Sequence, residues 1–286
     1  MQVGAAIAVS RLAVAEVPPL TLAMLRYVVG FACLVPFAWG GLRDWRAAEP
    51  LHGRVADHAA IAVLGVVQFG ILVALVNFGL QRTGAAEAAL IFSLFPLLTM
   101  LLSAGLGGDR MTAALAGGVL LSMAGVAVAL APKLGLRTGE GWSGELAVLA
   151  AALLGAICTV LYRPYLRRYP TVPVSALAML ASVAFLAVAA LVEDWPARIT
   201  GFSATAWAAT LFVGISSGIG FFAWLYALKR ESPTRVTVFL GLNPPTAALV
   251  AWALLGESLH AALFAGLALV TGGLWLATRG APAPSR

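Results

Sequence analysis

Long runs without a charged residue limit the fold of this chain more than any other feature. They cover residues 59–81, 88–108, 111–132, 146–162, 169–192, 199–228, 236–255 and 261–278. Most of them reach the roughly 17–25 residues that a helix needs to cross a bilayer. In hydrocarbon each backbone polar group must bond within its own segment, so we interpret these runs as transmembrane helices. The composition agrees, because only 10% of the residues are charged, against about a quarter in soluble domains.

Two further spans precede these runs. Residues 20–41 form one span that holds a single charge, at Arg26. The stretch before Glu16 forms a first span that is short for a bilayer. A cleaved signal peptide would also be short, but no basic segment precedes this stretch and Arg11 interrupts it. The sequence therefore predicts ten transmembrane helices, the first of them short or truncated.

The chain repeats itself. Residues 78–130 return as residues 226–278, so that Phe78 corresponds to Tyr226, Pro96 to Pro244 and Gly125 to Gly273. Each copy holds five predicted spans, and an odd number of spans inserts the second copy upside down. We therefore expect an all-α integral membrane fold with two inverted five-helix repeats, residues 1–132 and 143–279. This pattern is typical of membrane transporters.

Basic residues in the short loops predict the orientation. With ten spans, the loops on the side of both termini hold twelve Lys or Arg residues. The opposite side holds four, which are Arg82, Lys133, Arg137 and Arg198. By the positive-inside rule both termini are expected in the cytoplasm. The net charge of +6 is distributed over these loops, so it does not indicate nucleic-acid binding.

Prolines interrupt two predicted helices at matching points of the repeats. Pro96 would release the carbonyl of Phe92, and Pro244 with Pro245 would release carbonyls such as that of Gly241. Interrupted helices in corresponding places of inverted repeats indicate the binding site of a transporter. The alternative is a pair of purely structural kinks.

Polar and aromatic side chains deep in the spans are the candidate substrate contacts. An isolated polar group can instead bond a neighbouring helix, and an aromatic ring that follows a small-residue stretch can simply pack. The predicted substrate-binding residues are Gln68, Asn77, Ser93, Phe95, Thr159, Tyr162, Phe221, Trp224, Gly241 and Asn243.

Charged residues near one membrane face form a second group. Arg11 and Arg26 lie near the ends of the first two spans, close to Glu16 and Glu87 in the predicted arrangement. One interpretation is a pair of salt bridges at the outer mouth. The other is a gate, or an arginine that binds a carboxylate.

Several kinds of chemistry are not indicated. No Asp or Glu lies near the middle of a span, so proton exchange has no evident carrier. Cys33 and Cys158 are interpreted as small core residues, and the three histidines form no metal-binding pattern. We expect no metal, no cofactor and no catalytic residue.

Short motifs give the chain a family resemblance. They are Pro18-Pro19-Leu20-Thr21 with Leu25-Arg26-Tyr27, the turn Gly108-Asp109-Arg110-Met111, and its counterpart Gly256-Glu257-Ser258-Leu259. In this order, with the Pro96 and Pro244 helices, they resemble drug/metabolite transporters with EamA repeats. A Trp-Gly pair common in the first helix of that family is replaced here by Val3-Gly4, after Gln2.

The resemblance implies a bacterial inner-membrane exporter that works by alternating access. Its expected substrates are small metabolites, in particular amino acids including aromatic ones. The expected partners are this substrate and the lipid bilayer, with the protein acting as a monomer. Two alternatives remain open: a broad exporter of drugs or amphiphiles, and a membrane protein with a structural or assembly role.

Overall fold

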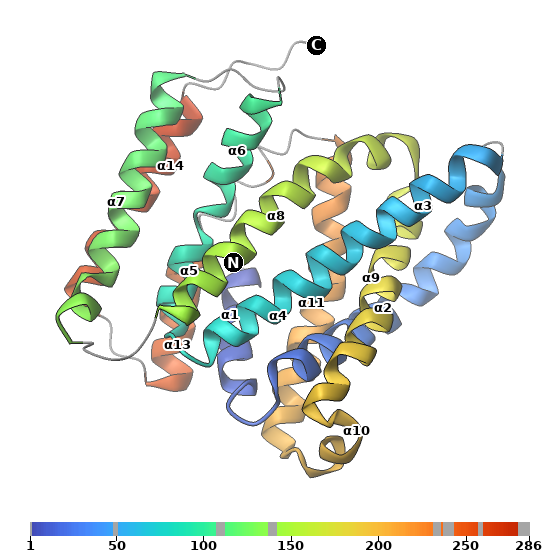
Figure 1. Cartoon of the computed structure of the whole chain (residues 1–286), viewed down its shortest axis with the longest axis horizontal. Coiled ribbons are helices and arrows are strands. Elements are labelled where there is room, and N and C mark those ends of the chain that lie inside the picture. The colour runs from blue at the N-terminus through green and yellow to red at the C-terminus, as the bar shows by residue number, and fades with distance from the viewer. Residues whose placement is uncertain are drawn as a thin grey trace.

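The computed structural model describes residues 2–47, 51–106, 112–136, 142–230, 236, 243–256 and 260–279. Every regular element in these ranges is helical (Figure 1). In chain order they are α1 (Gln2–Ala13), α2 (Pro19–Ala47), α3 (Leu51–Gly65), η1 (Val66–Ile71), α4 (Leu72–Leu80), α5 (Ala85–Phe92), α6 (Phe95–Gly105), α7 (Ala113–Leu136), α8 (Ser143–Arg168), α9 (Thr171–Ala189), η2 (Ala190–Glu193), α10 (Trp195–Arg198), η3 (Ile199–Gly201), α11 (Ala204–Arg230), α13 (Asn243–Leu255) and α14 (Ala261–Arg279).

Six helical stretches are long and apolar enough to cross a membrane. They are Val55–Leu80, Ala85–Gly105, Ala113–Ala131, Ser143–Arg168, Thr171–Glu193 and Ala204–Arg230. Shorter apolar helices cover Val3–Ala13, Pro19–Cys33 and Ala261–Ala277. Large apolar side chains such as Leu120, Met123 and Trp252 are exposed on this bundle, as expected where lipid is the solvent.

Two helices extend beyond the apolar segments of the sequence. α2 continues past residue 41 to Ala47, and α3 already begins at Leu51. α8 continues past Tyr162 through Pro164 to Arg168. In both places hydropathy ends at the membrane surface, whereas the backbone hydrogen bonds of the helix continue into the more polar residues.

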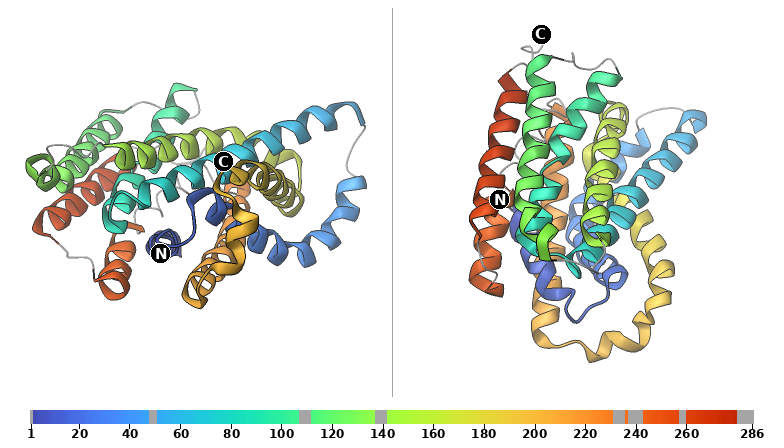
Figure 2. Two further views of the ribbon diagram at one scale, coloured as in Figure 1. Left: turned by 60° about the horizontal axis from the view of Figure 1, so that its bottom comes forward. Right: turned by 60° about the vertical axis from the view of Figure 1, so that its left-hand side comes forward.

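The helices form two groups joined by α8 and the central helices. At one edge α7 and α14 lie side by side, and at the other edge lie α2, α3 and α9 (Figures 1 and 2). Small residues permit the close packing of α7 with α14, since a Cβ on Gly118 would lie 2.4 Å from the carbonyl oxygen of Gly273. The turn between α1 and α2, the turn between α4 and α5, and α10 lie together at one end of the bundle, here called the α10 end (Figure 1).

Three irregularities interrupt the central helices. The segment η1 is a π-helix between α3 and α4, and such segments are frequent at functional sites. The helix at Pro96 is broken, because α5 ends at Phe92 and α6 begins at Phe95 after a short turn. In the second repeat α13 begins at Asn243, directly before Pro244. The predicted interruption at Pro96 is thus present, and Gly241 lies outside the described residues.

Candidate functional site

A cavity of about 130 Å³ lies in the middle of the bundle. Its walls come from α1, α2, η1, α4, α5, α6 and α11, and the lining residues are Val3, Arg26, Tyr27, Gln68, Phe69, Leu72, Val73, Phe92, Phe95, Ser217, Gly220, Phe221 and Trp224. An apolar protein cavity of about 150 Å³ accommodates benzene. This cavity therefore has room for a group of about the size of one aromatic ring.

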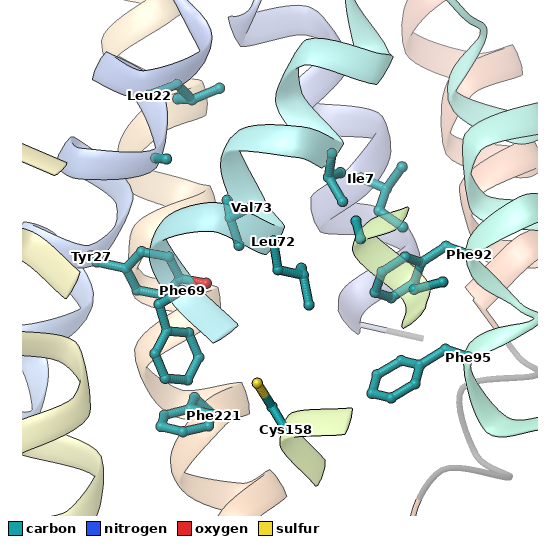
Figure 3. Packing of buried hydrophobic residues seen from close by; sticks show 14 of the residues in the cluster. Ile7, Leu22, Tyr27, Phe69, Leu72, Val73, Phe92, Phe95, Cys158 and Phe221 are labelled. Atoms are coloured by element: carbon teal, nitrogen blue, oxygen red, sulfur yellow. The ribbon is translucent and has the colours of Figure 1, made fainter. Parts of the chain in front are cut away.

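Aromatic side chains form most of the cavity wall. The ring centroids of Tyr27 and Phe69 are 5.0 Å apart, and those of Phe69 and Phe221 are 4.0 Å apart, both pairs meeting edge to face. On the opposite wall Phe95 contacts Phe92 at 5.5 Å and Trp224 at 5.9 Å. Figure 3 shows the first three rings on one side and Phe92 with Phe95 on the other. Edge-to-face pairs are favourable and hold each ring in one orientation.

Local irregularities of the backbone shape these two walls. Gln68 and Phe69 belong to η1, and the wider turn of a π-helix displaces them from regular helical register. The break after Phe92 lets Phe95 start a new helix. Gly155 of α8 leaves space for that ring, because a Cβ there would lie 3.1 Å from the Cζ of Phe95.

Among the described residues, the lining includes three polar side chains that are not aromatic, which are Arg26, Gln68 and Ser217. The hydroxyl of Tyr27 and the indole N–H of Trp224 belong to the aromatic wall. The Nε of Arg26 donates a hydrogen bond to the Oγ of Ser217 over 2.5 Å. The Ser217 hydroxyl itself donates to the carbonyl of Val213. The Oε1 of Gln68 is buried and accepts no hydrogen bond within the described part of the chain. Buried polar groups in an apolar site fix the orientation of a ligand.

Five residues selected from the sequence line this cavity: Gln68, Phe95, Phe221, Trp224 and Arg26. The first four were predicted as substrate contacts, and Arg26 was predicted as part of a gate or outer salt bridge. These five side chains come from α2, η1, α6 and α11, so the fold brings candidates that are far apart in the sequence to one cavity.

Other candidates lie away from the cavity. Asn77 donates from Nδ2 to the carbonyl of Pro19 over 2.9 Å and so joins α4 to α2. The hydroxyls of Ser93 and Thr159 donate to carbonyls of their own helices, at Leu90 and Gly155. These three side chains are buried and serve local hydrogen bonding.

Tyr162 and Asn243 are also buried outside the cavity lining. The Tyr162 hydroxyl and the Nδ2 of Asn243 have no hydrogen-bonding partner in the described ranges. Asn243 lies where α1 meets α13, because a Cβ on Gly4 would be 2.4 Å from its carbonyl oxygen. The Gly4 position thus allows α1 to contact the start of the interrupted helix.

Sequence reasoning missed eight lining residues, of which four are aromatic or polar: Tyr27, Phe69, Phe92 and Ser217. Tyr27 and Phe69 each follow a selected polar residue, so adjacency to Arg26 and Gln68 was the available signal. Ser217 belongs to a small-residue stretch that was interpreted as helix packing. That packing is present as well, since a Cβ on Gly218 would lie 2.7 Å from the carbonyl oxygen of Gly30.

The charged residues near the α10 end make several hydrogen bonds. Arg26 bonds Ser217, as described above. Glu87 accepts hydrogen bonds from the Thr83 hydroxyl and the Gly84 amide and so caps the start of α5, where free backbone amides attract a carboxylate. For Arg11, the Nε is buried without a hydrogen-bonding partner among the described residues. A role of these residues as a gate or as outer salt bridges stays a prediction.

Two carboxylates connect the N-terminal and C-terminal halves of the chain at the α10 end. Glu16, after α1, accepts hydrogen bonds from the amide and the hydroxyl of Ser203, before α11. These bonds lower the pKa of Glu16 below its ordinary value. Glu193 of η2 accepts hydrogen bonds from the amides of Leu20 and Thr21 and from the Thr21 hydroxyl, at 2.7–3.0 Å. A carboxylate at the start of α2 is favoured by the helix dipole. We call these two contacts the carboxylate bridges.

Metal binding has no evident site here: within the described ranges, no three His, Cys, Asp or Glu side chains gather in a metal-binding arrangement.

Comparison with known proteins places the chain among transporters. The sequence profile of the EamA-like transporter family matches twice, over residues 2–131 and 142–279. A protein of Streptantibioticus cattleyicolor described as "Probable terminal-alkyne amino-acid exporter" is 34% identical over 82% of this chain and 78% of its own length. The "Aromatic amino acid exporter YddG" of Ancylobacter novellus is 30% identical over 70% of this chain and 69% of its own length. A solved structure titled "Crystal structure of protein" superposes with a TM-score of 0.69 at 27% identity, over 97% of this chain and 95% of the other.

Proposed function

Because the chain belongs to the EamA-like transporter family, we propose that it exports amino acids with apolar or aromatic side chains by alternating access. One observation carries the proposal. The cavity in the middle of the bundle combines a wall of aromatic rings with very few polar groups, among them the guanidinium of Arg26. Such a site suits a small molecule with an apolar body and a charged head.

The relatives support this substrate class. One is described as an exporter of terminal-alkyne amino acids and another as an exporter of aromatic amino acids. A terminal alkyne and an aromatic ring are both flat or linear unsaturated groups, and both can pack against aromatic faces and edges. The cavity volume of about 130 Å³ is matched to a group of this size.

We propose that the chain consists of two inverted repeats of five transmembrane helices, residues 1–132 and 143–279. The two matches to the family profile support this division. The helices α6 and α13 begin at Phe95 and Asn243, positions that correspond in the internal repeat. Contacts between the repeats are reciprocal. The first helix of the first repeat, α1, packs against α11, the third span of the second repeat. In the same way the first helix of the second repeat, α8, packs against α4 in the third span of the first repeat.

In the proposed mechanism the carboxylate bridges close one entrance of the cavity. Glu16 and Glu193 each connect one repeat to the other at the α10 end. Opening at this end would break these bonds, and closure at the opposite end would replace them with other contacts. The distribution of basic residues supports an orientation with the α10 end outside and both termini in the cytoplasm. The proposed location is the bacterial inner membrane, with the protein acting as a monomer.

A second candidate is a broad exporter of drugs or amphiphiles. The apolar character of most lining residues favours it. The two candidates differ in the role of Arg26, which would repel a cationic drug and attract an amino-acid carboxylate.

Counterflow in proteoliposomes tests the proposal. Vesicles with purified protein are loaded with unlabelled L-phenylalanine, L-methionine or L-serine, and uptake of labelled L-phenylalanine is measured. Exchange is expected for L-phenylalanine and L-methionine and should be weak for L-serine, because its side chain gains little from the aromatic wall. Exchange of amphiphilic cations without any exchange of amino acids would favour the drug exporter. Absence of all flux would favour a structural role.

A further inference from the structure

Arg26 is the single charged residue in the apolar segment 20–41 of α2. It lies seven positions after the start of α2 and lines the central cavity. A charge within a membrane span is costly, so such a residue usually faces a functional site. The two acids that the sequence suggested as its partners, Glu16 and Glu87, accept hydrogen bonds from Ser203 and from Thr83 with Gly84. The function of the Arg26 charge therefore has to be sought in the cavity.

One edge of the Arg26 guanidinium is held in place. Its Nε donates to Ser217, whose own hydrogen is used toward Val213. The guanidinium carbon also lies 5.7 Å from the ring centroid of Tyr27. The hydrogen bond to Ser217 uses Nε alone and so does not occupy the two terminal nitrogens. An arginine edge with two parallel N–H groups is the geometry that binds a carboxylate through two hydrogen bonds.

Gln68 provides a complementary group. Its Oε1 is buried without a donor in the described part of the chain, and the residue lines the same cavity. A buried carbonyl oxygen without a donor is unfavourable until a ligand supplies one. An ammonium group has three N–H donors and is suited to this acceptor.

We infer that the cavity recognises the zwitterionic head of a free amino acid, an inference that rests on the proposed function. Arg26 binds the α-carboxylate through its terminal nitrogens, and the Oε1 of Gln68 accepts a hydrogen bond from the α-ammonium. The side chain of the substrate occupies the space between Phe69, Phe95 and Phe221. Ser217 is a positioning residue, because it fixes the guanidinium without contacting the substrate.

Three ligands separate these contributions: L-phenylalanine, phenethylamine, which lacks the carboxylate, and 3-phenylpropionate, which lacks the ammonium. Binding of each labelled ligand to the purified protein is measured by scintillation proximity. Arg26→Gln is expected to weaken L-phenylalanine binding on the order of ten- to a hundredfold, because charge-assisted hydrogen bonds to the carboxylate are lost. Binding of the cation phenethylamine should not weaken and should become tighter, because the repelling charge of Arg26 is removed. Gln68→Leu should weaken L-phenylalanine and phenethylamine but not 3-phenylpropionate.

Two further variants keep the test independent of folding. Arg26→Lys retains the charge but not the paired N–H geometry, so it should bind L-phenylalanine with intermediate affinity. Ser217→Ala should weaken L-phenylalanine severalfold and leave phenethylamine unchanged. Thermal stability is recorded for every variant.

The outcomes distinguish failure of the proposed amino-acid transport from failure of the inference about the zwitterionic head. If the wild-type protein neither binds nor exchanges any amino acid, the proposed function fails. If it exchanges L-phenylalanine but Arg26→Gln and Arg26→Lys bind it as the wild type does, only the inference about the head group is overturned. An equal loss of L-phenylalanine and phenethylamine in stable Arg26→Gln protein would also overturn it.

Discussion

Substitution of Glu193 by Gln tests whether the carboxylate bridges close the cavity. The Glu193 carboxylate accepts hydrogen bonds of 3.0, 2.7 and 2.7 Å from three donors at the start of α2. A glutamine has one acceptor oxygen, and its amide N–H groups would face the backbone amides. A hydrogen bond to a charged group contributes about 1.5–3 kcal/mol. With one bond lost and another weakened, we expect the closed state to be destabilised by about 2–4 kcal/mol.

This change in free energy corresponds to a shift of roughly thirty- to several-hundredfold in the closed-to-open ratio, since about 1.4 kcal/mol is a factor of ten. The assay uses a single cysteine in place of Leu72, which lines the cavity, with Cys33 and Cys158 replaced by alanine. An impermeant thiol reagent is added from the α10 side, and the rate of labelling is measured. We expect this rate to rise at least about tenfold in the Glu193→Gln variant.

Asp194→Asn is the matched control. Asp194 is the next residue and is exposed, and its left-handed backbone (φ 54°) accommodates asparagine. This variant loses the same charge but none of the bonds to α2, so its labelling rate should match that of the unmodified protein. Equal labelling of Glu193→Gln and the control would refute the view that Glu193 holds this entrance closed.

Four further predictions follow from the same structure. Cysteines at Arg198 and Arg168 should be labelled from opposite sides of the membrane, the first from outside; labelling of both from one side would contradict the proposed topology. Trp224→Ala should raise the KM for aromatic substrates more than for aliphatic ones, because it removes part of the aromatic wall. Both KM values are measured by counterflow, and an equal change for the two substrate classes would count against stacking. Flux should follow the substrate gradient after the pH gradient is collapsed with an ionophore, and accumulation driven by a pH gradient alone would assign proton transfer to an acid near the surface. The Glu16 bridge contributes above the ordinary glutamate pKa and is lost as the pH falls through the lowered pKa of the bonded Glu16. Because the reactive thiolate fraction itself falls with pH, labelling of the Leu72 cysteine from the α10 side is divided by labelling of an exposed cysteine in place of Asp194. This ratio should stay constant from pH 8 to 5 and rise only below the ordinary value of 4.5, and a rise near neutral pH would exclude Glu16 as its cause.

Hydropathy and internal repetition predicted the helical membrane fold and the interruption at Pro96. Both depend on local physics, because apolar runs must be helical in lipid and proline removes a helical donor. The ends of α2 and α8 were not predicted, since they extend beyond the apolar segments that hydropathy detects.

The cavity was only partly predictable. Deep polar or aromatic character selected Gln68, Phe95 and Trp224, which line the cavity. The same criterion selected Ser93 and Thr159, whose hydroxyls bond carbonyls of their own helices, an alternative that sequence cannot exclude. The π-helix that places Phe69 is an irregularity of backbone bonding without a hydropathy signal.

Long-range pairs were beyond prediction. Arg26 and Ser217 are separated by 191 residues, and Thr21 and Glu193 by 172. Such pairs exist only because α2 packs against α11 and η2, which come much later in the chain. Glu145 illustrates the same point, since it is 5% exposed in the first turn of α8 although no pattern in the sequence indicates a buried acid there.

The central claim is that an amino acid with an apolar side chain binds inside the cavity between the two aromatic walls. Locating free L-selenomethionine in crystals of the purified protein by anomalous scattering of its selenium tests this claim most directly. The account predicts one selenium peak among Phe69, Phe95 and Phe221, with the carboxylate density next to Arg26. A selenium peak on the lipid-facing surface, or none at a ligand concentration that saturates transport, would contradict it.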